Sequence, residues 1–296
     1  MNTKLLHIGL GKCGSVLLTH IFDEIEKETK IKFVNLFDFL QKKKTHALEN
    51  IINLQKDLPE NFIISHRTLF SKGWEFNQIF KSFEYNKKNF LKDTTVLIVI
   101  RNPYELLNSI YCQSINVMDI IEPQNFFYYE KNDLIRKGGK FNLYNFDYNN
   151  LISLYRSYFE NVIVIKYEEL HNLNFLKKIF NLNDKFLESL NIIKNQIYNK
   201  SISQNGIKFI LFLNKFIDLN KYQRLIRSNI KPTNNIFYKI KNFLLYQFLL
   251  RNFFQNKFDK LVPYKKYYIN KNHLPIDIDK LINDYNNIVT YNDIKN

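Results

Sequence analysis

The stretch LLHIGLGKCGSVLLTHIF (residues 5–22) contains the first strand, a glycine-rich turn and the first helix that the sequence predicts. The apolar run at residues 4–9 ends in glycine and predicts a short buried strand, and the amphipathic segment from Ser15 to about Lys27 predicts a helix. Such a turn gathers backbone N–H groups and the positive end of the helix dipole around one point. We therefore expect a phosphate or sulfate group to bind here.

The order of residues in this turn differs from that of a nucleoside triphosphate loop. Such a loop reads G-x-x-x-x-G-K-[ST], and the residue after the lysine holds Mg²⁺. Here Lys12 precedes the last glycine, Gly14, and is followed by Cys13, which is a poor magnesium ligand. A kinase that uses ATP and magnesium is therefore disfavoured, although it stays as an alternative.

Further strands and helices alternate along the first part of the chain. Three apolar runs are rich in Val and Ile and do not alternate with polar residues, as expected of parallel strands covered on both faces: residues 61–65, 94–100 and 161–167. Helical patterns lie between them at residues 103–115, with Pro103 at the first helical position, and at residues 149–159. The alternation predicts an α/β fold with a parallel sheet flanked by helices, followed from about Asn172 by a mainly helical part.

The length and composition favour one domain. A chain of 296 residues, 45% of them hydrophobic, can bury a substantial core. We predict one domain over residues 1–296, with a nucleotide-binding core at 1–170 and a mainly helical portion at 171–296. The first apolar run is too short for a signal peptide and no run reaches membrane-spanning length, so we expect a cytoplasmic protein.

The charge and the cysteines restrict the possible partners and sites. A net charge of +15 favours an anionic partner, although a sequence rich in Lys, Asn and Ile is also what an A/T-rich genome encodes. The basic residues are spread along the chain without a recognisable nucleic-acid-binding module, so we expect no nucleic acid. Cys13 and Cys112 have no neighbours at metal-ligand spacing, which makes a disulfide framework or a structural zinc site improbable.

A second motif, VLIVIRNPYELLNSI (residues 96–110), begins as a buried strand and continues into a helix. Arg101 follows the strand directly, at the edge where open α/β sheets bind ligands, and its guanidinium can contact two phosphate oxygens at once. Ser109 lies eight residues later on the helix. The alternative is that Arg101 only caps the strand and pairs with an acid such as Glu105.

The two motifs together resemble the P-loop-like sulfotransferases, of a bacterial type, that use 3′-phosphoadenosine 5′-phosphosulfate (PAPS). The resemblance covers about residues 4–170 and includes KYEEL at 166–170. It implies a P-loop-like topology, PAPS as co-substrate, 3′,5′-ADP as product and no metal. It also implies a 3′-phosphate site at Arg101 and Ser109, and a 5′-phosphosulfate loop formed by Gly11, Lys12, Cys13, Gly14, Ser15 and Val16.

Sulfuryl transfer needs a base for the acceptor proton and a positive group beside the leaving oxygen. Lys12 fits the second role. His66 directly follows a predicted strand, in a context similar to that of the catalytic histidine of cytosolic sulfotransferases, and is the predicted base. The alternatives are that His66 only bonds a loop carbonyl, and that Glu75 or an acid of residues 120–147 is the base.

Four weaker signals each have two interpretations. Residues 120–147 lack clean periodicity and are typical of a lid or acceptor-binding loop. Lys200, Ser201 and Ser203 are either nucleotide contacts or a helix cap. The aromatic and basic run at 236–258 is a packed helix, an oligomer contact or a membrane-surface helix. Cys13 either has a low thiol pKa beside Lys12 and a helix start, or merely fills the loop.

The expected activity is sulfuryl transfer from PAPS to a hydroxyl, or less often an amine, of a carbohydrate or glycolipid-like acceptor. Val16 and Leu17 stand where the family often has a second hydroxyl residue and, in cytosolic members, a tryptophan. A non-catalytic anion or polysaccharide binder on the same fold is therefore one alternative, and a P-loop kinase is another. Peripheral membrane contact and the oligomeric state stay open.

Overall fold

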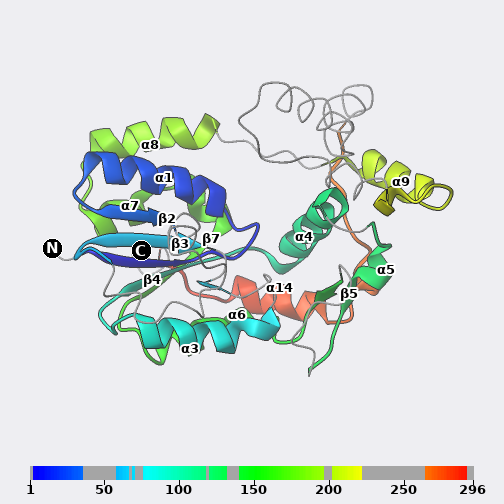
Figure 1. The fold of residues 1–296 in the computed structure, drawn as a ribbon, viewed down its shortest axis with the longest axis horizontal. Coiled ribbons are helices and arrows are strands. Elements are labelled where there is room, and N and C mark those ends of the chain that lie inside the picture. The colour runs from blue at the N-terminus through cyan, green and yellow to red at the C-terminus, as the bar shows by residue number, and fades with distance from the viewer. Residues whose placement is uncertain are drawn as a thin grey trace.

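The chain folds around a five-stranded parallel sheet with the strand order β2-β3-β1-β4-β7 (Figure 1). The structure, a computed structural model, describes residues 3–35, 58–66, 69–70, 76–117, 120–131, 140–196, 202–221 and 264–291. The strands are β1 (Lys4–Ile8), β2 (Lys32–Asn35), β3 (Phe62–His66), β4 (Thr95–Ile100) and β7 (Val162–Lys166). The predicted α/β class, with a parallel sheet flanked by helices, is confirmed.

Helices cover both faces of this sheet, which explains why the strands read as continuous apolar runs. One face carries α1 (Ser15–Glu28) and α8 (Asp184–Gln196), and the opposite face carries α3 (Ile79–Asn89) and α6 (Tyr148–Arg156) (Figure 1). Every residue of β4 from Val96 to Ile100 is fully buried. The described helices that remain are α4 (Pro103–Val117), α5 (Pro123–Phe126), α7 (Asn174–Phe180), α9 (Gln204–Leu213) and α14 (Ile278–Asn286), with 3-10 turns η4 (Phe76–Gln78), η5 (Tyr167–His171) and η7 (Lys271–His273). None of the described helices is long and apolar enough to cross a membrane.

The helix α4 begins where the sequence predicts. Pro103 is its first residue, and the side-chain oxygen of Asn102 accepts hydrogen bonds from the backbone N–H groups of Tyr104 and Glu105. A proline at the first position and an asparagine before it satisfy the helix start locally. This cap fixes the direction in which α4 leaves the end of β4.

The irregular segment at residues 120–147 is built differently from a simple lid. Its described ends hold α5 and a second, two-stranded sheet of β5 (Phe127–Tyr128) and β6 (Phe141–Asn142). Five aromatic or aliphatic side chains of these ends are buried in the core: Phe126, Phe127, Phe141, Leu143 and Phe146. The ends therefore belong to the packed core, and residues 132–139 between them lie outside the described residues.

Residues 264–291 pack against α4 and β7. The ring of Tyr267 stacks on that of Tyr111, with the centroids 5.7 Å apart, and the backbone N–H of Ile269 donates to Asn108 of α4 at 2.6 Å. The backbone N–H of Tyr291 donates to the carbonyl of Val164 in β7 at 2.9 Å. These contacts bring a late part of the sequence to the end of β4.

A buried histidine pairs β1 with β3 in the core. Nδ1 of His7 lies 2.7 Å from the hydroxyl oxygen of Ser65, and its ring meets Phe22 of α1 edge to face at 5.8 Å. Its Nε2 has no hydrogen-bond partner among the described residues. Burial away from water disfavours the charged ring and lowers the pKa of His7 to about 3.

Because the pKa of His7 is low in the folded chain, we expect the free energy of unfolding to decrease as the pH falls below about 6.5. The pKa of His7 is lower in the folded chain than in the unfolded chain. Below about pH 6.5 the unfolded chain therefore binds a proton at His7, whereas the folded chain binds it only as the pH approaches about 3. The contribution is complete above pH 6.5 and declines below it by roughly 1 kcal/mol per pH unit. Denaturant unfolding between pH 7 and pH 5 measures this slope.

The matched variant is His7→Gln, which keeps a hydrogen-bonding group beside Ser65 and removes the titration. We expect its free energy of unfolding to depend less on pH between 6.5 and 5, a range in which few ordinary carboxyl groups take up protons. Identical slopes for the two proteins would contradict this account of His7.

Candidate functional site

The candidate site lies beyond the carboxyl ends of β1 and β4. These strands are neighbours, with Ile8 opposite Ile98. The chain after β1 enters α1 on one face of the sheet, whereas the chain after β4 reaches α6 on the other face before it enters β7 (Figure 1). Connections that leave toward opposite faces open a crevice between two strand ends, which is where open α/β sheets bind ligands. Both predicted anion-binding motifs lie at these strand ends.

The loop between β1 and α1 is held by its own backbone. The N–H of Cys13 donates to the carbonyl of Leu10 at 3.2 Å, and the hydroxyl of Ser15 donates to the same carbonyl at 3.2 Å. Lys12 and Gly14 both have positive φ, at 69° and 79°. A lysine in this left-handed region is strained, and such strain is found more often at functional sites than elsewhere.

The first turn of α1 has no side-chain cap within the described part of the chain. Gly14 is its N-cap, no described side chain accepts a hydrogen bond from this end, and the first turn contains no acid. The partial positive charge of the helix end is therefore not neutralised by the helix itself. This is the feature that the glycine-rich turn predicts.

Arg101 connects the end of β4 with this loop. Its Nη1 donates to the backbone carbonyl of Lys12 at 3.0 Å, and its guanidinium lies 4.5 Å from the ring centroid of Tyr167. Its Nε is buried and has no hydrogen-bond partner within the described ranges. The two motifs, 89 residues apart in sequence, are in direct contact.

The ion pair that the alternative interpretation predicts is present, but it is long and shared. Nη2 of Arg101 lies 3.7 Å from the carboxylate of Glu105. That carboxylate accepts a hydrogen bond from Lys266 and another, at 3.0 Å, from the hydroxyl of Tyr268. Since closer donors already occupy Glu105, it neutralises Arg101 only in part.

One face of α4 lines the loop. Nζ of Lys12 donates to the side-chain oxygen of Gln113 at 2.8 Å. Gln113 lies four residues after Ser109, which lies four residues after Glu105, so the three share a face of the helix. Ser109 is partly buried on this face. The structure thus brings Lys12, Arg101 and the helix face of Ser109 together.

Cys13 is a packing residue. Its side chain is 1% exposed, and burial raises the pKa of its thiol, which opposes the low pKa considered for a thiol beside Lys12. The thiol is therefore not accessible to a ligand outside the protein. Val16, by contrast, is 55% exposed at the start of α1.

The remaining predicted residues differ in how far the structure describes them. His66 ends β3 and pairs with Ile8 of β1, so its backbone lies at the same sheet edge as the loop, and its side chain lies outside the described part. Ser203 is buried and its hydroxyl accepts a hydrogen bond from the N–H of Gly206, so this residue caps α9. Three other predictions lie outside the described residues: Glu75, the pair Lys200 and Ser201, and the run at 236–258.

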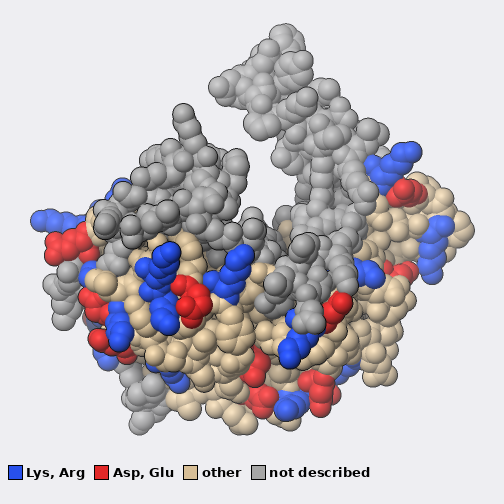
Figure 2. All heavy atoms as spheres, turned by 60° about the horizontal axis from the view of Figure 1, so that its bottom comes forward, with Lys and Arg blue, Asp and Glu red and all other residues tan. Residues whose placement is uncertain are grey.

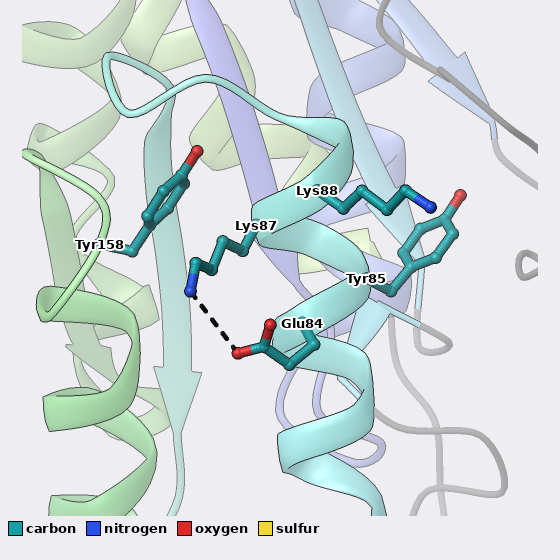
Figure 3. Close-up of a pocket in the computed structure, with 5 residues that line it drawn as sticks. All are labelled: Glu84, Tyr85, Lys87, Lys88 and Tyr158. Carbon is teal, nitrogen blue, oxygen red and sulfur yellow. Dashed lines mark ion pairs between the residues drawn. The ribbon is translucent and has the colours of Figure 1, made fainter.

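An open pocket elsewhere in the molecule does not coincide with this site. It is lined by Glu84, Tyr85, Lys87 and Lys88 of α3 and by Tyr158 (Figure 3). The end of α3 and Tyr158 precede the amino ends of β4 and β7, so the pocket lies at the sheet edge opposite the candidate site.

The lysines of this pocket have local explanations. Lys87 and Lys88 occupy the last turn of α3, where the helix dipole favours cations. The ammonium groups of Lys87 and Lys92 lie 5.8 and 5.7 Å from the ring centroid of Tyr158. A ligand that stacks on this ring would have to displace them, so we do not assign a function to the pocket.

The described residues show neither a basic patch on the face of Figure 2 nor a metal-binding cluster. Lysine and arginine side chains are interspersed with acidic ones on the face shown in Figure 2, rather than gathered in one patch. No group of three or more His, Cys, Asp and Glu side chains within the described ranges is arranged to hold a metal ion. No family model matches the chain, and comparisons with the curated proteins and with the solved structures likewise gave no match.

Proposed function

We propose that this protein is a sulfotransferase that moves a sulfuryl group from PAPS to a hydroxyl, or an amine, of a carbohydrate or glycolipid-like acceptor. The observation that carries the proposal is the hydrogen bond from Arg101 to the carbonyl of Lys12. It joins the motif that resembles a 5′-phosphosulfate loop to the motif that resembles a 3′-phosphate site. A nucleotide with phosphates at both positions needs the two motifs side by side.

The residues around this contact fit an anion with several oxygens. The uncapped first turn of α1, the ammonium of Lys12 and the hydroxyl of Ser109 supply donors. The buried Nε of Arg101, which has no partner among the described residues, is a further donor. A buried donor without a partner is costly, and a bound phosphate oxygen would remove that cost.

The strand order supports a P-loop-like sulfotransferase topology for the core. Because β1 lies between β3 and β4, the loop that follows β1 is flanked on one side by the end of β3 and on the other by the end of β4. These ends carry His66 and Arg101. A base and a phosphate-binding arginine on opposite sides of one loop suit transfer between a nucleotide and an acceptor.

Each residue then has a distinct task. PAPS supplies the sulfuryl group and leaves as 3′,5′-ADP. Lys12 places a positive charge where the leaving phosphate oxygen develops negative charge, and Arg101 and Ser109 hold the 3′-phosphate. His66 takes the proton of the acceptor hydroxyl as its oxygen attacks sulfur. In the free protein Gln113 holds the ammonium of Lys12 until a more negative partner is bound.

Arg101→Ala tests the 3′-phosphate assignment by calorimetric titration. The wild type is expected to bind 3′,5′-ADP with or without magnesium, and to bind ADP at least tenfold more weakly. A hydrogen bond to a charged group is worth about 1.5–3 kcal/mol, or about 10- to 150-fold in affinity, so Arg101→Ala should lose most of this preference, with Ser109 left as the contact to the 3′-phosphate. Arg156→Ala, which removes an exposed arginine of α6, is the matched control and should retain the preference.

The same titration separates the rival functions. Equal binding of ADP and 3′,5′-ADP by the wild type would overturn the proposal, and magnesium-dependent binding of ATP would favour a kinase. The buried thiol of Cys13 already disfavours a kinase, because the position after the lysine cannot offer a ligand to Mg²⁺. The exposed Val16, at a position where the family often has a hydroxyl, favours a non-catalytic binder as the second candidate. Such a binder would take up 3′,5′-ADP and sulfate no acceptor.

A further inference from the structure

The helix α9 has exposed aromatic side chains on its outer face. Gly206, Ile207 and Ile210 are buried on its inner face, whereas Phe209, Phe212 and Phe216 are 40, 54 and 72% exposed. The helical turn continues past the end of α9, since the N–H of residue 216 donates to the carbonyl of residue 213. Spacings of three and four residues therefore place the three rings on one outer face, which we call the α9 aromatic face.

Phe212 and Phe216 form a cluster rather than two separate exposed residues. The rings of Phe212 and Phe216 meet edge to face with their centroids 5.1 Å apart. In the fold, α9 stands outside the sheet and its covering helices, at the end of the molecule opposite the N-terminus (Figure 1). A contiguous exposed apolar cluster on a soluble surface is typical of an interaction site.

Lysines border the α9 aromatic face. Lys208 and Lys215 are exposed and lie seven residues, or about two helical turns, apart beside the phenylalanines, and Lys221 is exposed after the helix. Asp218 is the one acid among the described residues 202–221. Phenylalanines with lysines alongside are the composition of a helix that lies in a membrane interface, where the rings enter the apolar layer and the ammonium groups reach anionic headgroups.

We propose that the α9 aromatic face docks onto an anionic lipid surface. The charges favour lipid over a second copy of the chain, because two-fold pairing of this face would bring Lys208 and Lys215 of both copies together on chains that each carry a net charge of +15. The sequence at 222–263 has almost exclusively basic charged residues, so it too would leave these lysines without opposite charges. An anionic bilayer supplies both an apolar layer and negative charge.

The test is co-sedimentation of the full chain with vesicles of 30% phosphatidylglycerol in phosphatidylcholine, and with vesicles of phosphatidylcholine alone. We expect binding to the anionic vesicles that is at least tenfold tighter and that weakens in high salt. Phe212→Ser with Phe216→Ser should weaken it at least tenfold, as should Lys208→Glu with Lys215→Glu. Phe80→Ser, which removes a 45% exposed phenylalanine from α3, is the matched control and should bind as the wild type does.

Three results would overturn this inference. The first is that the wild type and both double variants bind vesicles equally well. The second is that the wild type binds the two kinds of vesicle equally well. The third is that the wild type binds no vesicles and instead forms a dimer, which the Phe212→Ser, Phe216→Ser variant does not form. The lysine double variant changes only exposed side chains and therefore keeps the test valid if the phenylalanine variant folds poorly. Titration with 3′,5′-ADP is independent of α9, so failure here leaves the proposed function intact.

Discussion

Gly14→Ala is expected to lower the free energy of unfolding by about 2–5 kcal/mol. The φ of Gly14 is 79°, and a side chain in that region costs roughly 1–2 kcal/mol. The added Cβ would also lie 2.5 Å from Cδ1 of Leu170 in η5, which is buried. Crowding of this kind in a packed core costs about 1–3 kcal/mol. Chemical denaturation of the two proteins measures the difference.

A double-mutant cycle separates the two causes. In a Leu170→Ala background the crowding at Cδ1 is gone, so Gly14→Ala should then cost only the backbone part, roughly 1–2 kcal/mol. Gly11 lies in the same loop and does not have a positive φ, so Gly11→Ala is the control and should cost clearly less. A loss at Gly14 that is equal in both backgrounds and equal to that at Gly11 would contradict the account.

The central strands could be predicted because a strand that is buried on both faces has a continuous run of apolar residues. The run that became β4 is apolar and fully buried from Val96 to Ile100, and the sequence locates the strand to within one residue. The strand β2 lacks such an apolar run, because it is four residues long and begins and ends with the polar Lys32 and Asn35. Its place at the edge of the sheet comes from pairing with β3, a contact made at long range.

Some residues of the candidate site could likewise be predicted from the sequence, and others could not. The positions of Lys12 and Arg101 follow from the rule that parallel strands end at one edge, so the sequence could predict their proximity. Gln113 could have been found from its spacing of four residues after Ser109. Lys266 and Tyr268 could not, because they reach Glu105 from more than 160 residues away and no local pattern marks them.

His66→Ala is expected to reduce turnover by about 10²- to 10⁴-fold while 3′,5′-ADP still binds. His66 ends β3, and its backbone pairs with Ile8, the last residue of β1 before the loop that contains Lys12. A histidine there lies next to the loop and is not one of the residues, Lys12 and Arg101, that we propose to bind phosphate. Loss of a positioned base removes the rate that it contributes, about 10²–10⁴, and leaves nucleotide affinity unchanged. Single-turnover sulfation assays and titration with 3′,5′-ADP measure the two effects separately.

The controls decide whether His66 acts as a base or only holds the loop. His66→Gln keeps a hydrogen-bonding side chain but cannot take up the proton. If His66 is the base, the turnover of His66→Gln should therefore fall as far as that of His66→Ala. If His66 only bonds a loop carbonyl, the glutamine variant should recover most of the activity. His20→Ala removes an exposed histidine of α1 and should retain full turnover. Unchanged turnover in His66→Ala would assign the base to another group and would leave the proposed anion site at Lys12 and Arg101 unaffected.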